Sequence, residues 1–208
     1  MLGLTDAEYR TLASLSTPGK IQDYLDALPI NHEKKEETCI SPRMVLRQKK
    51  AHCLEGALLA AVALWIAGEK PLIMNLRTTD DDQDHAVVLF RRDGFWGALS
   101  KTNHAVLRYR DPVYRSPREI ALSYFHEYFM YEGGKKTLRA YSKPVNVKRF
   151  GTAWITSEES VWKVAEALAD APHTTIVTKD QIRHLRPATR FERDMLEKAE
   201  WKRSDPRT

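Results

Sequence analysis

The stretch AHCLEGALLAAVALWIAG, residues 51–68, decides the fold. It is rich in Ala and Leu, it is apolar on nearly every side, and Gly68 closes it, which predicts a helix of about fifteen residues. Because a helix that is apolar all round has to be buried, we expect it at the centre of the molecule. Its apolar part, residues 57–67, is about half as long as a bilayer crossing requires, so we expect no membrane span.

Three shorter helices are predicted before this segment. Thr5 and Glu8 form a capping-box pattern, Pro18-Gly19 precedes the second helix, and Ser41 before Pro42 is typical of an N-cap with proline in the first turn. The predicted helices cover residues 5–15, 20–29 and 41–46. The polar residues 31–38 are predicted to form a surface loop.

Three strands are predicted after the apolar helix, at residues 72–76, 85–90 and 95–100. The last two are joined by a segment containing Asp93-Gly94, which is typical of a tight hairpin turn. A single buried helix followed by antiparallel strands predicts an α+β domain, with the central helix packed on the sheet.

The second half of the chain predicts fewer well-defined elements. We expect a helix at 117–131, a strand at 152–156, a helix at 158–169, a strand at 174–177 and a charged last helix at 188–201. Gly133-Gly134 is the one plausible internal boundary. It divides the chain into a domain at 1–132 and an extension at 133–208, which packs on the domain or is part of it.

Composition places the chain among ordinary globular proteins. Its 208 residues are 42% hydrophobic and 29% charged, and the formal net charge is +5. The basic excess is concentrated in residues 91–150, with thirteen Lys and Arg against five Asp and Glu. The N-terminus has no secretory pattern, and two cysteines are too few for a disulfide framework. We therefore expect a cytoplasmic protein with reduced thiols.

Cys53 is the first candidate for chemistry. It stands at or near the first turn of the apolar helix, where free backbone amides and the helix dipole stabilise a thiolate. Lys49, Lys50 and His52 add positive charge nearby. The alternative is that Cys53 is a small buried hydrophobic residue. Cys39 falls in a loop and suggests no role.

His85 is the second candidate, because a histidine at the start of a strand can point over a neighbouring helix terminus. A Cys–His pair can exchange a proton, attack an acyl carbon as thiolate and protonate the leaving group as imidazolium. The alternative is a surface histidine that caps the acidic loop at residues 80–84. That loop lacks the ligand pattern of a calcium-binding loop, so no metal site is expected there.

The order of these features resembles the transglutaminase-like superfamily, whose members share the papain-like cysteine fold. The motifs that carry the resemblance are AHCLEGALLAAVAL around Cys53, DDDQDHAVVLF around His85 and GFWGALSKTN after it, within residues 45–116. The resemblance implies a Cys-His-Asp or Cys-His-Asn triad for amide hydrolysis, deamidation or acyl transfer. It implies no metal or organic cofactor, and a protein, peptide or small amide as substrate.

The sequence departs from the family at the third member of the triad. The family shows an aspartate four residues after an aromatic residue, and counted from Trp96 that position is Ser100. A serine cannot supply the negative charge that steadies an imidazolium. Asn103 can orient the ring by accepting its N–H, and Asp111 is a third candidate.

The length of the hairpin turn bears on the choice. A two-residue turn at Asp93-Gly94 places His85 opposite Thr102 with Ser100 on the same face, whereas a five-residue turn places Asn103 opposite His85. We favour Asn103 as the orienting group.

An acyl-transfer site also needs donors for the oxyanion. The backbone N–H of Cys53 is one, because it lies at a helix start. Gln48 is a possible second donor, since papain-like enzymes place a glutamine shortly before their cysteine. The alternative is an exposed glutamine at a helix end.

The rival function is a non-catalytic binding module on the same scaffold. Arg108 and Arg110 alternate with Tyr109 in a basic stretch that suits nucleic acid or an acidic protein, although a half-exposed strand produces the same alternation. The sequence leaves the oligomeric state open.

Overall fold

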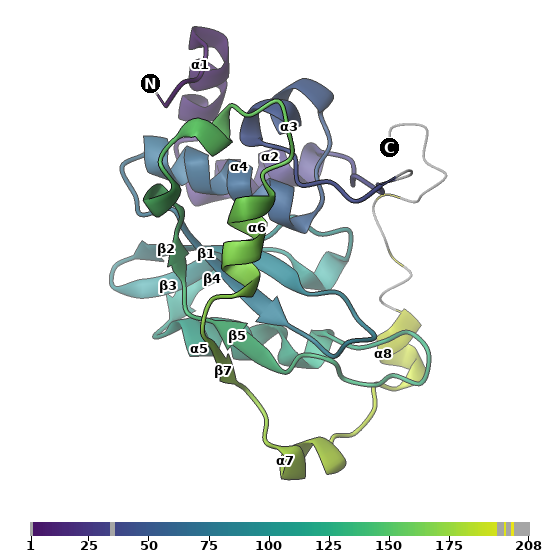
Figure 1. Cartoon of the computed structure of the whole chain (residues 1–208). Coiled ribbons are helices and arrows are strands. Elements are labelled where there is room, and N and C mark those ends of the chain that lie inside the picture. The colour runs from purple at the N-terminus through teal and green to yellow at the C-terminus, as the bar shows by residue number, and fades with distance from the viewer. Residues whose placement is uncertain (1, 34–35, 195–197, 199–200, 202–208) are drawn as a thin grey trace.

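The computed structural model describes residues 2–33, 36–194, 198 and 201. Its architecture is α+β, with an open antiparallel sheet between helices on both faces (Figure 1). The helices are α1 (Asp6–Ser14), α2 (Pro18–Ala27), α3 (Pro42–Gln48), α4 (Cys53–Ile66), α5 (Pro117–Tyr124), α6 (Trp162–Ala169), α7 (Lys179–Arg183) and α8 (Arg190–Asp194). The strands are β1 (Leu72–Arg77), β2 (His85–Arg92), β3 (Phe95–Leu99), β4 (Arg110–Tyr114), β5 (Ala140–Ser142), β6 (Val145–Asn146) and β7 (His173–Thr175).

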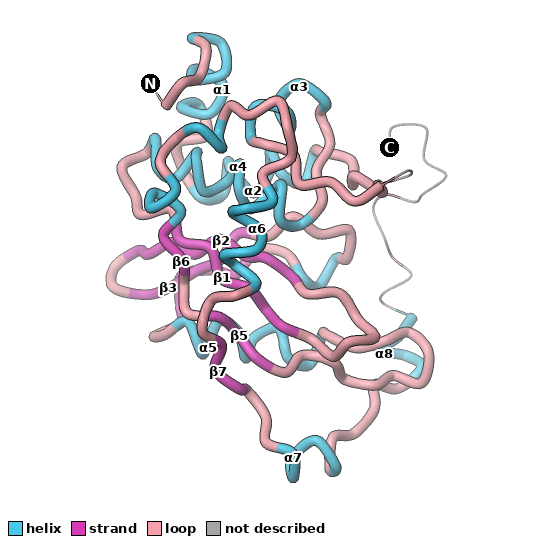
Figure 2. The backbone as a smooth tube through the Cα atoms, viewed as in Figure 1, coloured by secondary structure: helices cyan, strands magenta, loops and turns pink. Residues whose placement is uncertain are grey.

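The strands, which are magenta in Figure 2, form one sheet. Their order is β4-β3-β2-β1-β5-β7, and β6 also pairs with β1. One hydrophobic core lies between the sheet and the helices α1 to α4, and it includes Ile73, Val88 and Leu99 from the sheet. A second core on the opposite face contains Met74, Leu89 and residues of α5. The predicted α+β class is therefore confirmed.

Helix α4 is the central helix that its composition predicts. Every side chain from Glu55 to Leu64 is buried, and the helix packs on β1 and β2. Gly56 allows a close approach, because a Cβ at this position would lie 2.4 Å from the Cβ of Lys101. Among the described residues, no helix is both long and apolar enough to cross a membrane.

The hairpin between β2 and β3 has the two-residue turn. Arg92 pairs with Phe95, and both turn residues, Asp93 and Gly94, have positive φ values of 51° and 85°. These are the conformations that a type I′ turn requires. The register continues to Val88 opposite Leu99 at the other end of β3.

The residues after Gly133-Gly134 extend the same sheet. Strand β5 pairs with β1 on one side and with β7 on the other. Helix α6 packs against β1 on the face that α4 covers, as Figure 1 shows. Residues before and after Gly133-Gly134 therefore contribute strands to the same sheet.

Several predicted elements in this half differ from the structure. The strand predicted at 152–156 is a 3-10 helix at Ala153–Ile155, where the indole N–H of Trp154 donates to the carbonyl of Gly151 at 3.0 Å. The helix predicted at 117–131 ends at Tyr124, because the chain then turns and Phe129 pairs with Lys136.

The remaining differences concern the ends of predicted helices. The helix predicted at 158–169 begins only at Trp162. Of the last helix predicted at 188–201, only Arg190–Asp194 is helical among the described residues, and 195–197, 199 and 200 lie outside them.

Candidate active site

Cys53 is the first residue of α4. It is partly exposed, and it borders a cavity of about 440 Å³. Because the first backbone N–H groups of a helix have no partner within the helix, they face a negative charge placed there. The predicted position of Cys53 at a helix start is therefore correct.

His52 is the N-cap of this helix. Its Nδ1 accepts the backbone N–H of Leu54 at 3.2 Å, and its Nε2 lies 2.9 Å from the carbonyl oxygen of Thr38 and 3.3 Å from Oε1 of Glu55. A charged ring keeps the Thr38 and Glu55 contacts and loses the cap on Leu54. The ring is thus held beside Cys53 in either state.

Glu55 is a fully buried carboxylate that holds the loop before Ser41 against α4. It accepts hydrogen bonds from the Asn31 amide, the Thr38 hydroxyl, and the backbone N–H groups of Ile40 and His52. Burial raises its pKa, but these donors and the His52 ring lower it to about 2. Glu55 is therefore ionised, and the ends of the predicted surface loop at 31–38 are anchored to it.

His85 is the first residue of β2 and is buried. Its Nε2 lies 2.6 Å from the hydroxyl oxygen of Ser100, directly after β3. Because Val88 pairs with Leu99, continuing the register places His85 opposite Thr102 and puts Ser100 on the same face. The two-residue turn therefore makes Ser100 the partner of His85.

The backbone of Ser100 is fixed by Gln22 of α2. The Gln22 amide donates to the Ser100 carbonyl at 2.9 Å, and its side-chain oxygen accepts the Ser100 N–H at 3.1 Å. The next residue, Lys101, is fully buried, and its ammonium donates to the carbonyl of Leu28. The strand end that carries Ser100 is thereby tied to α2.

The thiol of Cys53 is strongly acidic in this environment. Burial raises its pKa, but hydrogen bonds and charge interactions with His52 and His85 lower it to about 5. The thiolate and Glu55 in turn raise the pKa of His52, against the opposing effect of burial. Cys53 is consequently a thiolate at neutral pH, flanked by two imidazoles.

The 440 Å³ cavity that contains the thiol has an acidic wall. Besides Cys53, His52 and His85, its wall contains five carboxylate side chains, those of Glu33, Glu37, Asp82, Asp84 and Glu127. Tyr128 is buried on the same wall, its ring centroid is 6.3 Å from that of His85, and its hydroxyl donates to the carbonyl of Gln83. Tyr128 thus ties the acidic loop at residues 80–84 to the wall that carries His85.

Three other predicted site residues take different positions. Asn103 lines the cavity, but its amide group exchanges two hydrogen bonds with the backbone of Trp201, at 2.6 and 2.7 Å. Asp111 is exposed in β4, and Gln48 is exposed at the end of α3. Neither belongs to the wall of this cavity.

Arginines of the basic stretch make contacts within the fold. Arg110 pairs with Glu127, and its guanidinium lies 4.1 Å from the centroid of the Tyr124 ring. Arg108 lies 3.5 Å from Asp26. These contacts hold Arg110 against Tyr124 of α5 and Arg108 against Asp26 of α2.

Two residues that the sequence argument missed hold the site together, Glu55 and Gln22. A single glutamate within an otherwise apolar helix, three residues after the N-cap, was a usable signal for Glu55. The signal for Gln22 was weaker, because it was only a polar residue on the apolar face of α2. Within the described part of the chain, no group of three or more His, Cys, Asp or Glu is arranged to hold a metal ion.

Comparison with protein-family models and with curated proteins finds no match for this chain. Its function therefore has to be argued from the geometry of Cys53 and its neighbours.

Proposed function

We propose that this protein is a cysteine-dependent acyl-transfer enzyme with a transglutaminase-like core. The observation that carries the proposal is a thiol with a pKa of about 5, at a helix start, beside a buried histidine on a solvent-accessible cavity. Perturbed groups of this kind are typical of catalytic sites. The order of helix, histidine strand and following strand supports the same interpretation.

The roles follow from the geometry. The sulfur of Cys53 attacks the carbonyl carbon, and the backbone N–H at the start of α4 stabilises the oxyanion. The carbon–nitrogen bond of the substrate breaks, and the His85 imidazolium gives its proton to the leaving amine. Water or another amine then attacks the thioester with His85 as base, and the thiolate is regenerated.

Ser100 is the orienting residue in this proposal. With His85 as an imidazolium, Nε2 donates to the Ser100 hydroxyl oxygen 2.6 Å away, which leaves Nδ1 for the thiol and the leaving group. A hydroxyl orients the ring without adding a negative charge, which an aspartate at the same position would add. His52 provides the second positive charge beside the sulfur.

Active-ester kinetics test the proposal. With 4-nitrophenyl acetate we expect a burst of one nitrophenolate per chain, because acylation of Cys53 precedes slower hydrolysis of the thioester. The Cys53→Ala variant loses the burst, and the Cys39→Ala variant keeps it. A burst of equal size in Cys53→Ala would disprove the role of this cysteine.

A further inference from the structure

A second cavity, of about 240 Å³, also opens at Cys53, between α4, the sheet and α6. Its wall is mostly aliphatic and is formed by Leu54, Ile73, Ala86, Ala165, Leu168 and Ala169, together with Cys53, Asn75 and Asp84. We call it the α6 pocket. Its size is below that of typical drug-sized ligand sites, and it suits a side-chain-sized group.

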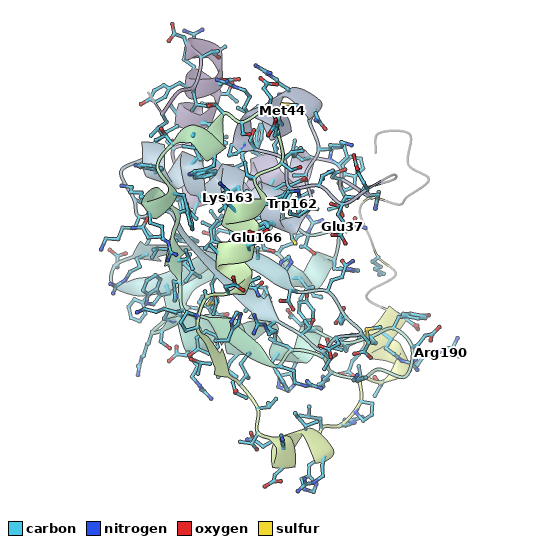
Figure 3. The ribbon with its side chains drawn as sticks, viewed as in Figure 1. Glu37, Met44, Trp162, Lys163, Glu166 and Arg190 are labelled. Atoms are coloured by element: carbon cyan, nitrogen blue, oxygen red, sulfur yellow. The ribbon has the colours of Figure 1, made fainter. Side chains whose placement is uncertain are left out.

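Helix α6 provides the small residues that leave this space. Ala165, Leu168 and Ala169 are spaced three and four residues apart and so share one face of the helix. Lys163 and Glu166, labelled in Figure 3, are exposed members of the same helix and do not line the pocket. The pocket therefore depends on a helix outside residues 45–116, which carry the family resemblance.

The two cavities differ in charge. The wall of the 440 Å³ cavity has five carboxylates, which outnumber the two cations on the same wall, the ammonium of Lys101 and the ring of His52. A negative wall in a protein of net charge +5 favours neutral or cationic groups and repels anions. The α6 pocket has Asp84 as its one ionisable carboxylate, and this residue also lines the larger cavity.

The position of His85 distinguishes the roles of the two cavities. His85 lines the 440 Å³ cavity and is not part of the wall of the α6 pocket. Because the leaving group takes its proton from His85, it must depart on the side of the larger cavity. The acyl group that remains on the sulfur of Cys53 then lies on the other side, toward α6.

We propose that the α6 pocket binds an aliphatic acyl group, and that the acidic cavity binds a neutral or cationic leaving group or acceptor. This inference rests on the proposed function. The sulfur–carbon bond forms with the acyl carbon, the bond to the leaving group breaks, and the leaving group departs with the His85 proton. Water then attacks the acyl carbon with His85 as base, the sulfur–carbon bond breaks, and the aliphatic carboxylic acid leaves as the Cys53 thiolate is regenerated.

Esters that share one leaving group test the acyl preference. The probes are the 4-nitrophenyl esters of acetate, butyrate and succinate, and the measurement is kcat/KM from nitrophenolate release. Two extra methylenes buried in the pocket predict a butyrate value about tenfold above acetate. The succinate ester, which carries a carboxylate, is expected to fall below butyrate.

Filling the pocket tests its location. In Ala165→Leu the ratio of butyrate to acetate is expected to fall to about one, and Ala169→Leu serves as a second filling variant in case the first does not fold. Lys163→Leu is the matched control on the exposed face of α6 and keeps the preference. Thermal unfolding of each variant reports whether it is folded.

The outcomes separate the two proposals. Equal rates for acetate and butyrate in the native protein, or a preference that survives both filling variants, overturn the α6 pocket. Release that is as fast in Cys53→Ala as in the native protein, or no release from any ester, overturns the acyl-transfer function itself.

Discussion

The two cysteines occupy contrasting environments a short distance apart in the chain. Cys39 is fully buried, and burial together with the negative charge of Glu55 raises its pKa to about 12. Burial also acts against ionisation of Cys53, yet the pKa of this thiol falls to about 5. The difference is the presence of two imidazoles, from His52 and His85. Charged neighbours, and not burial, decide which thiol is reactive.

Replacing each cysteine in turn should give the largest contrast. Cys53→Ala removes the nucleophile, so we expect acylation by 4-nitrophenyl acetate to fall to the rate in buffer. Cys39→Ala should keep the acylation rate within about twofold, because Cys39 lines neither of the two cavities at Cys53. Equal losses in both variants would contradict the assignment of the nucleophile.

Removing His85 should have the next largest effect. His85→Ala takes away the general acid for the leaving group and one of the two imidazoles that stabilise the thiolate, so we expect kcat for acylation to fall about 100-fold or more. The pKa of Cys53 should also rise, which shifts the pH profile of alkylation upward. His184, an exposed histidine at the end of α7, provides the control variant His184→Ala. An unchanged pH profile in His85→Ala would exclude the pairing.

The choice between Ser100 and Asn103 predicts a smaller difference. Ser100→Ala removes the acceptor of the His85 Nε2 proton, and we expect kcat to fall about tenfold. Asn103→Ala should have the weaker effect on kcat, because the Asn103 amide is bonded to Trp201. The reverse order in single-turnover measurements would restore Asn103 as the orienting group.

His52→Asn should produce the smallest effect, and only in acid. Asparagine retains the ability to cap α4 but removes the second imidazole. The pKa of Cys53 should therefore rise, so alkylation slows several-fold near pH 5 and changes little at pH 8. His52→Ala, which has no side-chain acceptor to cap α4, should unfold at a lower temperature than His52→Asn. If the pH profile of alkylation is identical for the native protein and His52→Asn, His52 does not lower the pKa of Cys53, and His85 alone activates it.

The elements that sequence predicted well are those with strong local signals. Helix α4 follows from its Ala and Leu content, and the β2–β3 hairpin follows from Asp93-Gly94. The segment at 152–156 was predicted wrongly, because its alternating residues resemble a strand while Trp154 bonds locally to Gly151. Strands β5 and β6 are too short to give a pattern of their own. They exist because β1 offers a partner.

The candidate site divides in the same way. Cys53 and His85 could be proposed from their places at a helix start and a strand start. The two-residue turn already placed Ser100 on the same face as His85. Analogy with papain-like enzymes, in which an asparagine orients the histidine, nevertheless favoured Asn103. Glu55 and the α6 pocket depend on contacts between segments far apart in sequence, and no local pattern contains that information.

The pH dependence of Cys53 alkylation tests the central claim most directly. The measurement uses iodoacetamide on the Cys39→Ala protein, with the modified residue identified by mass spectrometry. Because thiolate is the reactive form, the rate should rise with pH to a midpoint near 5 and be constant at neutral pH. A midpoint between about pH 8 and 9, as for an ordinary thiol, would contradict the account.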